Sequence, residues 1–449
     1  MIRSTVTAFA AATAGILALG VLAAPATAAP HTPPNRTPQL GEVFNGYVVG
    51  TFGSGRLAGP GEIFAPLVSG DPFYAEPRLT GTEKPGTLLK AKKVAVQFTG
   101  FRPGNVDAYK LMYVTTGLRG APEISTGIVM IPRDGKRNDQ RKVIGYQFAN
   151  DSVGAYCHPS TMWTGGDPMD GASWSALGPL AQMFGKGYAV AISDVGNDGD
   201  RRPHGVFAGK FAGNAMSDML RATLGYARLG LNPKAPVGLF GIAGGGVGAA
   251  FAAENAADYA PDLDIRSTVL EGMVVNQRNF IRTASGSVGS GFAFATLLGL
   301  EPKYPEMKID DHLNPAGKAL ADVYRTQCQT PAYFTLPYVP LQALFTGNRH
   351  PADIKAFQRV YRDNLLGRKA PASRVLIASC AADDSPMSLV PAADSRRLAR
   401  SYRSRGTKVA YHPTDCSMVK MLTDMYGWGT DLFGMQTIDW LDWSLRAPR

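Results

Sequence analysis

Short apolar runs alternate with helical patterns along most of the chain. Runs rich in β-branched and aromatic residues, bounded by turn residues, predict strands. They lie at 109–116, 124–131, 142–148, 188–193, 237–240, 267–275, 374–379 and 408–412. One apolar stripe at helical spacing is formed by Met216, Met219, Leu220, Leu224 and Ala227. A further helix is expected over 391–405, ending at Gly406. This alternation predicts an α/β fold with a mostly parallel sheet covered by helices on both faces.

The alternation stops between residues 277 and 370. This stretch begins with a glycine-dotted apolar segment, 286–300, and continues with proline-rich and helical pieces. We interpret it as a helical cap inserted before the last two strands, with the apolar sequence forming a lid. The two flanking parts, 61–276 and 371–449, then form one core.

The N-terminus predicts export from the cell. Arg3 precedes an uninterrupted apolar and small-residue run, and Ala26-Thr27-Ala28 is a small-x-small cleavage site. The run is too short and too rich in alanine for a typical membrane anchor. Residues 1–28 are therefore interpreted as a cleaved signal peptide, and the Pro-, Thr- and Gly-rich segment 29–60 as a loose arm.

Composition describes a globular protein with a large core, since 45% of the residues are hydrophobic and 18% are charged. The net charge is +10, but the basic residues are dispersed except around Arg396-Arg397. This distribution does not indicate nucleic-acid binding, and leaves a solvated face or weak attraction to an anionic cell envelope as interpretations. No motif indicates a metal or another cofactor.

The most informative local motif is a nucleophile elbow without its nucleophile. Residues 237–254 read as a strand, a glycine-flanked turn and a small-residue helix. In the G-x-S-x-G pattern, alanine replaces serine: Gly241-Ile242-Ala243-Gly244-Gly245. Since Ala243 offers only a methyl group, the turn can persist while covalent catalysis is lost. No other serine has glycine at both i−2 and i+2.

Two other interpretations fit this segment. A glycine-rich turn between strand and helix can be a simple packing corner. Gly244, Gly246 and Ala249, with Asp264 further on, also fit a dinucleotide-binding turn. The predicted export argues against the second reading.

Several segments, taken in order, resemble the secretory lipase family of the α/β-hydrolase superfamily. They are DPFYAEP (71–77), PGTLLK (85–90), YQFANDSVGAYCHPS (146–160), GKGYAVAISDVG (185–196), the elbow, and VLIASCAADDSPMSLVP (375–391). The resemblance spans about residues 70–445 and implies an α/β-hydrolase fold. It also implies a triacylglycerol or carboxylic ester as the substrate class.

The resemblance assigns the catalytic positions residue by residue. The nucleophile position is Ala243, and the acid position is Asp383. The histidine position is Cys416, because Asp415-Cys416 stands where the family has Asp-His. Two of the three members of the triad are thus replaced, while the acid is kept.

The oxyanion hole is better preserved than the triad. Gly244 follows the nucleophile position, and Asp151 lies in the second contributing segment. The family's Cys-Ala-Pro-Ser reads Cys157-His158-Pro159-Ser160 here. This change introduces His158, which we interpret as a surface or packing histidine rather than a displaced base.

The four cysteines of an exported chain favour two disulfides, and spacing alone leaves three pairings open. The resemblance implies Cys157–Cys328, which leaves Cys380 and Cys416. These two end neighbouring strand–loop units whose loops meet in an α/β-hydrolase, so we expect them to pair. The alternative is a free Cys416 thiol acting as nucleophile, although His412 is expected to point away along its strand.

Three functions remain as hypotheses. The first is a non-catalytic lipase homologue that binds a lipid or acyl ester in the former active-site pocket. The second is an active lipase or esterase that uses a non-standard residue. The third is a secreted structural or cell-envelope interaction protein in which the pocket has no role.

One loop carries Asp194, Asn197, Asp198 and Asp200. Their oxygen atoms suit calcium, but the spacing matches no EF-hand pattern, so we interpret them as turn-forming residues.

Overall fold

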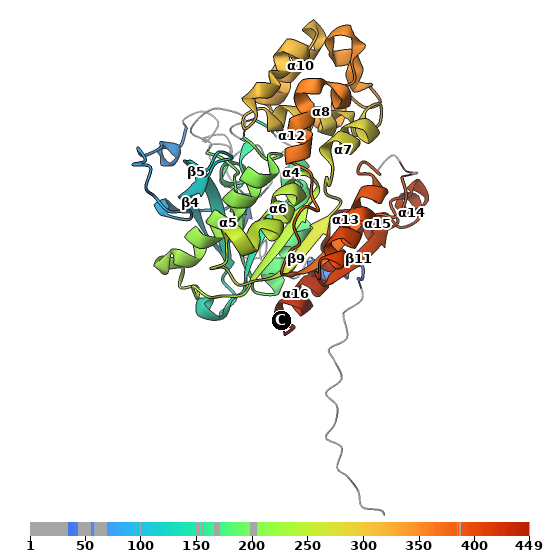
Figure 1. The fold of residues 1–449 in the computed structure, drawn as a ribbon. Coiled ribbons are helices and arrows are strands. Elements are labelled where there is room, and N and C mark those ends of the chain that lie inside the picture. Colours follow the sequence, from blue (N-terminus) through green and yellow to red (C-terminus); the bar gives the residue numbers. More distant parts are fainter. Residues whose placement is uncertain are drawn as a thin grey trace, which may run out of the picture. The chain divides into compact units, whose positions relative to one another are not determined.

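A nine-stranded sheet forms the centre of the computed structural model (Figure 1). The structure describes residues 35–43, 55–57, 70–98, 100–149, 153–154, 157–165, 171–197, 204–383, 385 and 388–448. The strand order is β11-β10-β9-β8-β6-β7-β5-β4-β2. The bounds are β2 Leu88–Val94, β4 Val106–Thr116, β5 Pro122–Pro132, β6 Val143–Gln147, β7 Ala189–Ser193, β8 Val237–Ile242, β9 Ile265–Glu271, β10 Arg374–Cys380 and β11 Val409–Thr414.

Six neighbouring strands, from β11 to β7, run parallel, and β5, β4 and β2 continue the sheet antiparallel. The mostly parallel sheet is therefore confirmed, and all eight predicted strands are present within a few residues of their expected bounds. Sequence reasoning missed β2 and the short pair β1 (Arg56–Leu57) and β3 (Phe101–Arg102).

Helices cover both faces of the sheet, as predicted. Successive residues of the central strand β8 belong to different cores: Leu239 packs with one cluster and Phe240 with the other. Helices α5 (Gly209–Gly225), α6 (Ala243–Tyr259) and α13 (Ala392–Ser404) supply residues to the first cluster. Helices α4 (Gly171–Gly185) and α16 (Ile438–Arg446) supply residues to the second. Burial of both faces explains the nearly continuous apolar runs of the central parallel strands β6, β7 and β8.

The chain between β9 and β10 contains helices and no named strand, and it is drawn in yellow and orange in Figure 1. Its α-helices are α7 Gln277–Ala284, α8 Ser290–Leu300, α9 Ile309–His312, α10 Pro315–Thr326, α11 Thr330–Phe334 and α12 Gln358–Asp363. Helix α8 is almost entirely buried, because its sequence is apolar on every side. The interpretation of 277–370 as a separate cap remains a prediction.

The remaining α-helices among the described residues are short. They are α1 Leu40–Val43, α3 Pro159–Met162, α14 Met418–Thr423 and α15 Met425–Leu432. Part of the arm predicted over 29–60 is attached to the core: Arg36 pairs with Asp439 of α16, and Tyr426 donates to the carbonyl of Pro38. Within the described part of the chain, no helix combines the length and apolar character needed to span a membrane.

Candidate functional site

The turn between β8 and α6 has the conformation of a nucleophile elbow. Ile242 ends β8 in an extended conformation, and Ala243 follows at a φ of 47°. This left-handed region costs an L-residue other than glycine roughly 1–2 kcal/mol. The chain therefore keeps the strained backbone that would present a side chain at the carboxyl end of the sheet, although that side chain is a methyl group.

The glycines on either side are required by close approaches. A Cβ atom on Gly241 would lie 2.5 Å from the Cβ of Ala249, in the helix that follows. A Cβ atom on Gly245 would lie 2.2 Å from the carbonyl oxygen of Phe148, the residue after β6. The first turn of α6 is thus packed against the end of β6, where the second oxyanion segment begins.

Gly244 occupies the position after Ala243, in the first turn of α6, where backbone N–H groups have no partner within the helix. This is the geometry that lets a backbone N–H face a developing oxyanion. Asp151, the other predicted member of the oxyanion hole, lies outside the described residues.

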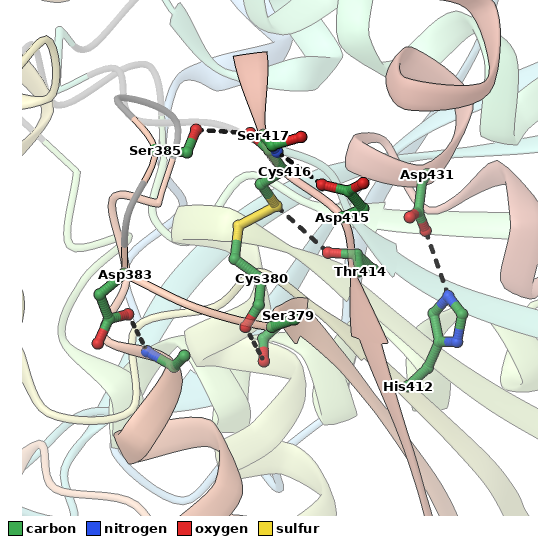
Figure 2. The surroundings of a disulfide bond; sticks show 12 residues. Ser379, Cys380, Asp383, Ser385, His412, Thr414, Asp415, Cys416, Ser417 and Asp431 are labelled. Carbon is green, nitrogen blue, oxygen red and sulfur yellow. Dashed lines mark hydrogen bonds and ion pairs between the residues drawn. A yellow bond between two sulfur atoms is a disulfide. The ribbon is translucent and has the colours of Figure 1, made fainter. Parts of the chain in front are cut away.

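The histidine position is occupied by a disulfide. Cys416 is bonded to Cys380, with 5.5 Å between their Cα atoms (Figure 2). The parallel register places Cys380 beside Thr414, so the ends of β10 and β11 bring the two cysteines together. Cys416 is buried, and its Sγ lies 3.3 Å from the hydroxyl of Thr414. The second disulfide joins Cys157 to Cys328.

Both pairings are those expected from the sequence. All four cysteines are bonded, so the alternative of a free Cys416 thiol is wrong. Sulfur in a disulfide is not a thiolate and cannot act as the nucleophile.

Asp383 does not approach the histidine position. Its exposed carboxylate accepts a 2.6 Å hydrogen bond from the backbone N–H of Ala392, at the start of α13. Figure 2 shows this carboxylate directed away from Cys416, with the disulfide between Asp383 and His412 in the view. A carboxylate at a helix N-terminus satisfies an otherwise unpaired N–H and is favoured by the helix dipole. The residue at the acid position thus has a structural contact.

A second acidic group lies beside the elbow, and sequence reasoning missed it. Glu271 ends β9 directly beside Ile242, and its buried carboxyl accepts a hydrogen bond from Thr437. Burial, and to a lesser degree the charge of Asp431, raises the pKa of Glu271 to about 8. Asp431 also lies 3.5 Å from Nε2 of His412. Glu271 is the one acidic residue of β9 and stands at its carboxyl end, and that position was the available signal.

His158 is fully buried rather than at the surface. Its ring packs edge-on against that of His204, with 4.5 Å between centroids. None of the four ring nitrogens has a hydrogen-bond partner among the described residues. Burial lowers the pKa of both rings, that of His204 to about 3, so both are neutral at neutral pH.

One small cavity borders Gly245, in the first turn of α6. It has a volume of about 10 Å³ and lies between Gly245, Phe148, Asp194 and Val206. Asp194 accepts hydrogen bonds from Ser160 and Thr126 and is therefore part of a structural network. Asp198 and Asp200, the other carboxylates of the loop considered for calcium, lie outside the described residues.

Comparison with known proteins identifies relatives that match most of the chain. The family model described as secretory lipase matches residues 177–437. The probable inactive lipase MT1628 of Mycobacterium tuberculosis is 30% identical over 77% of this chain and 77% of its own. Secreted triacylglycerol lipase LIP2 of Malassezia furfur is also 30% identical, over 59% of this chain and 56% of its own.

Among solved structures, Candida antarctica lipase A in its closed state has a TM-score of 0.68 at 21% identity. The match covers 85% of this chain and 87% of that one. The esterase LipA of Xanthomonas oryzae has a TM-score of 0.61 at 18% identity, covering 81% and 100%. These likenesses show that the fold is that of an α/β-hydrolase.

Proposed function

Because this chain belongs to the secretory lipase family, we propose that it is an exported homologue that has lost ordinary ester hydrolysis. In this proposal it binds a lipid or acyl ester beside the elbow. The observation that carries the proposal is Ala243, a methyl group held in the strained conformation of a nucleophile elbow. A methyl group cannot form the acyl-enzyme on which a serine hydrolase depends.

The surroundings of Cys416 support the same conclusion. The acid–histidine hydrogen bond of an active enzyme needs an imidazole at this position. Here a covalent bond joins Cys416 to Cys380, and Asp383 caps α13. Loss of the serine or the histidine of a triad costs about a million-fold in turnover. The relative from M. tuberculosis carries the name of a probable inactive lipase.

The rival hypothesis is an active lipase that uses another residue. It is favoured by the similarity to relatives named secreted triacylglycerol lipases. The chain offers one described imidazole–carboxylate pair near the end of the sheet, His412 and Asp431. His412 lies on β11 and Asp431 on α15, and we assign no nucleophilic hydroxyl or thiol to this pair. We therefore favour binding over catalysis.

The helical region 277–370 has the role of a cap in this proposal. Its apolar helix α8 is almost entirely buried. An acyl chain is much larger than the cavity of about 10 Å³ beside Gly245, so in this proposal its binding requires the residues around that cavity to move. Export is supported by the N-terminal signal pattern and by the two disulfides.

The proposal is tested with protein purified after export, using hexadecanoic acid as the probe. Native mass spectrometry is expected to detect one bound chain. Saturating ligand is expected to raise the melting temperature, because binding only the folded state stabilises it. Val206→Trp, which fills the cavity beside Gly245, is expected to abolish both effects. The control is Val323→Trp on the exposed side of α10, which should leave both unchanged.

Two results would overturn lipid binding. One is the absence of a bound mass and of any thermal shift in the parent protein. The other is equal binding by both tryptophan variants.

A separate test addresses the lost triad: Ala243→Ser alone is expected to restore little activity. The same change with Cys416→His and Cys380→Ala should restore some, because serine then regains a base.

A further inference from the structure

One buried amide beside the elbow has no hydrogen-bond partner. Gln147 ends β6 and pairs in register with Gly241 of β8, which stands two residues before Ala243. Gln147 is buried, with 4% of its surface exposed. Among the described residues, neither its Oε1 nor its Nε2 is hydrogen-bonded. Native proteins rarely leave both polar atoms of a buried amide unpaired, because each atom has then lost its bonds to water without replacement.

A glycine in helix α6 leaves room for this amide. A Cβ atom on Gly248 would lie 2.2 Å from Oε1 of Gln147 and 3.0 Å from the Cβ of Ala212 in α5. Any side chain at position 248 would therefore have to displace the amide. Glycine is unfavourable inside a helix, so the chain accepts a poor helix residue at the point where α6 meets Gln147.

Gln147 lines the small cavity that borders Gly245. The other polar side chains of this lining are those of Ser193 and Asp194. Ser193 is hydrogen-bonded to Tyr113, and Asp194 accepts hydrogen bonds from two hydroxyl groups. Of the polar side chains that line the cavity, only that of Gln147 therefore has no partner among the described residues. The volume of about 10 Å³ is close to the space that one water-sized polar group needs.

The chemistry of the lining restricts the group that fits this cavity. The amide of Gln147 accepts through Oε1 and donates through Nε2, so a group that both donates and accepts satisfies both atoms. A hydroxyl, a primary amide and a protonated carboxyl group have this property, whereas an ester only accepts. None of the described residues that line the cavity is basic, and the buried carboxyl group of Asp194 is among them. An anionic group would therefore meet like charge without a counter-ion.

We propose that Gln147 selects the polar end of the ligand that binds beside the elbow. This inference rests on the proposed lipid binding and narrows its ligand class to amphiphiles whose uncharged polar end both donates and accepts hydrogen bonds. That end lies in the cavity against the amide, and the hydrocarbon chain, which the cavity cannot hold, extends out of it. A site built to hydrogen-bond a polar group rejects analogues that lack the group, because its own polar atoms are then left unpaired.

The test compares probes that differ in their polar end, using exported protein and isothermal titration calorimetry. Decan-1-ol and decanamide both donate and accept hydrogen bonds. Their counterparts, decyl methyl ether and methyl decanoate, only accept. We expect the alcohol and the primary amide to bind at least tenfold more tightly than their counterparts. This order is measured on the parent protein, so it does not depend on whether a variant folds.

The variant Gln147→Met removes the amide and keeps an unbranched side chain. Its affinity for the alcohol and the primary amide should fall at least tenfold, and its preference over the counterparts should fall below twofold. Without ligand, it should melt at the same temperature as the parent or higher, because two unpaired polar atoms leave the core. A merely structural role would instead lower the melting temperature and leave the preference intact. The control is Gln182→Met on α4, which should preserve affinity and preference: its amide oxygen also has no partner among the described residues, but Gln182 does not line the cavity.

Two results would overturn this inference and leave lipid binding intact. One is equal affinity of the parent for the two probes of each pair, and the other is an unchanged preference in Gln147→Met. Binding of hexadecanoic acid by the parent shows in either case that the proposed function holds. Failure of the parent to bind hexadecanoic acid and all four probes would overturn both.

Discussion

Removal of the Cys380–Cys416 disulfide is expected to destabilise the protein by a predictable amount. The bond closes a loop with a sequence separation of 36 residues. In the chain-entropy model this loop corresponds to about 4 kcal/mol at 25 °C. The variant Cys380→Ala/Cys416→Ala should lose roughly this amount. The matched control, Cys157→Ala/Cys328→Ala, opens a separation of 171 residues and should lose about 5 kcal/mol.

The expected change in melting temperature follows from the size of the folded unit. Unfolding entropy is about 2.1 cal/mol/K per residue, or roughly 0.9 kcal/mol/K for about 400 residues. The melting temperature should therefore fall by about 4–5 °C in the first variant and by about 6 °C in the control. Differential scanning calorimetry of the exported proteins, without reductant, measures both values.

Two results would refute this reasoning. The first is alkylation of Cys416 by iodoacetamide in the native, unreduced protein, which would mean that the thiol is free. The second is a first variant as stable as the parent while the control loses its expected stability. In that case the bridge at the histidine position would not restrain the chain.

The remaining predictions concern the elbow and the acid beside it. Gly245→Ala should cost at least about 2 kcal/mol in urea unfolding, because its methyl group would lie 2.2 Å from a backbone oxygen. Gly225→Ala, which meets nothing within 4 Å, should be neutral or stabilising. Ala243→Gly should stabilise by about 1 kcal/mol by relieving a positive φ, whereas Ala257→Gly in the same helix should destabilise by a similar amount. Glu271 has a pKa of about 8 when folded and about 4.5 when unfolded, so its stabilising contribution is complete below pH 4.5 and is lost as pH rises towards 8. Glu271→Gln should therefore flatten the fall of stability with pH over this range, and an unchanged slope would contradict the assignment.

The central strands β6, β7 and β8 could be predicted because they are buried on both faces. Their apolar runs are nearly continuous, and each is followed by a clear turn or helix signal. Strand β2 escaped prediction because its sequence, LLKAKKV, carries three lysines at the opposite edge of the sheet. An edge strand needs few apolar residues, so its pattern resembles that of a loop.

The candidate site was predictable where its chemistry is local. The elbow depends on a few consecutive residues, so its glycines and Ala243 were visible in the sequence. The direction of Asp383 was not, because capping α13 and reaching the histidine position are both compatible with the same loop. Glu271 and Asp431 are 160 positions apart in the sequence, and only the fold brings them near each other. The full burial of His158 could not be predicted either, because it depends on contact with His204, which is distant in the sequence.

The central claim is that this member of a lipase family has lost ordinary ester hydrolysis. The most direct test is the turnover of a short p-nitrophenyl ester by the exported, unmodified protein. We predict no hydrolysis above the rate of the buffer, because Ala243 cannot form an acyl-enzyme. Turnover of about 1 s⁻¹ or more that persists through repurification, an ordinary enzymatic rate, would contradict the account.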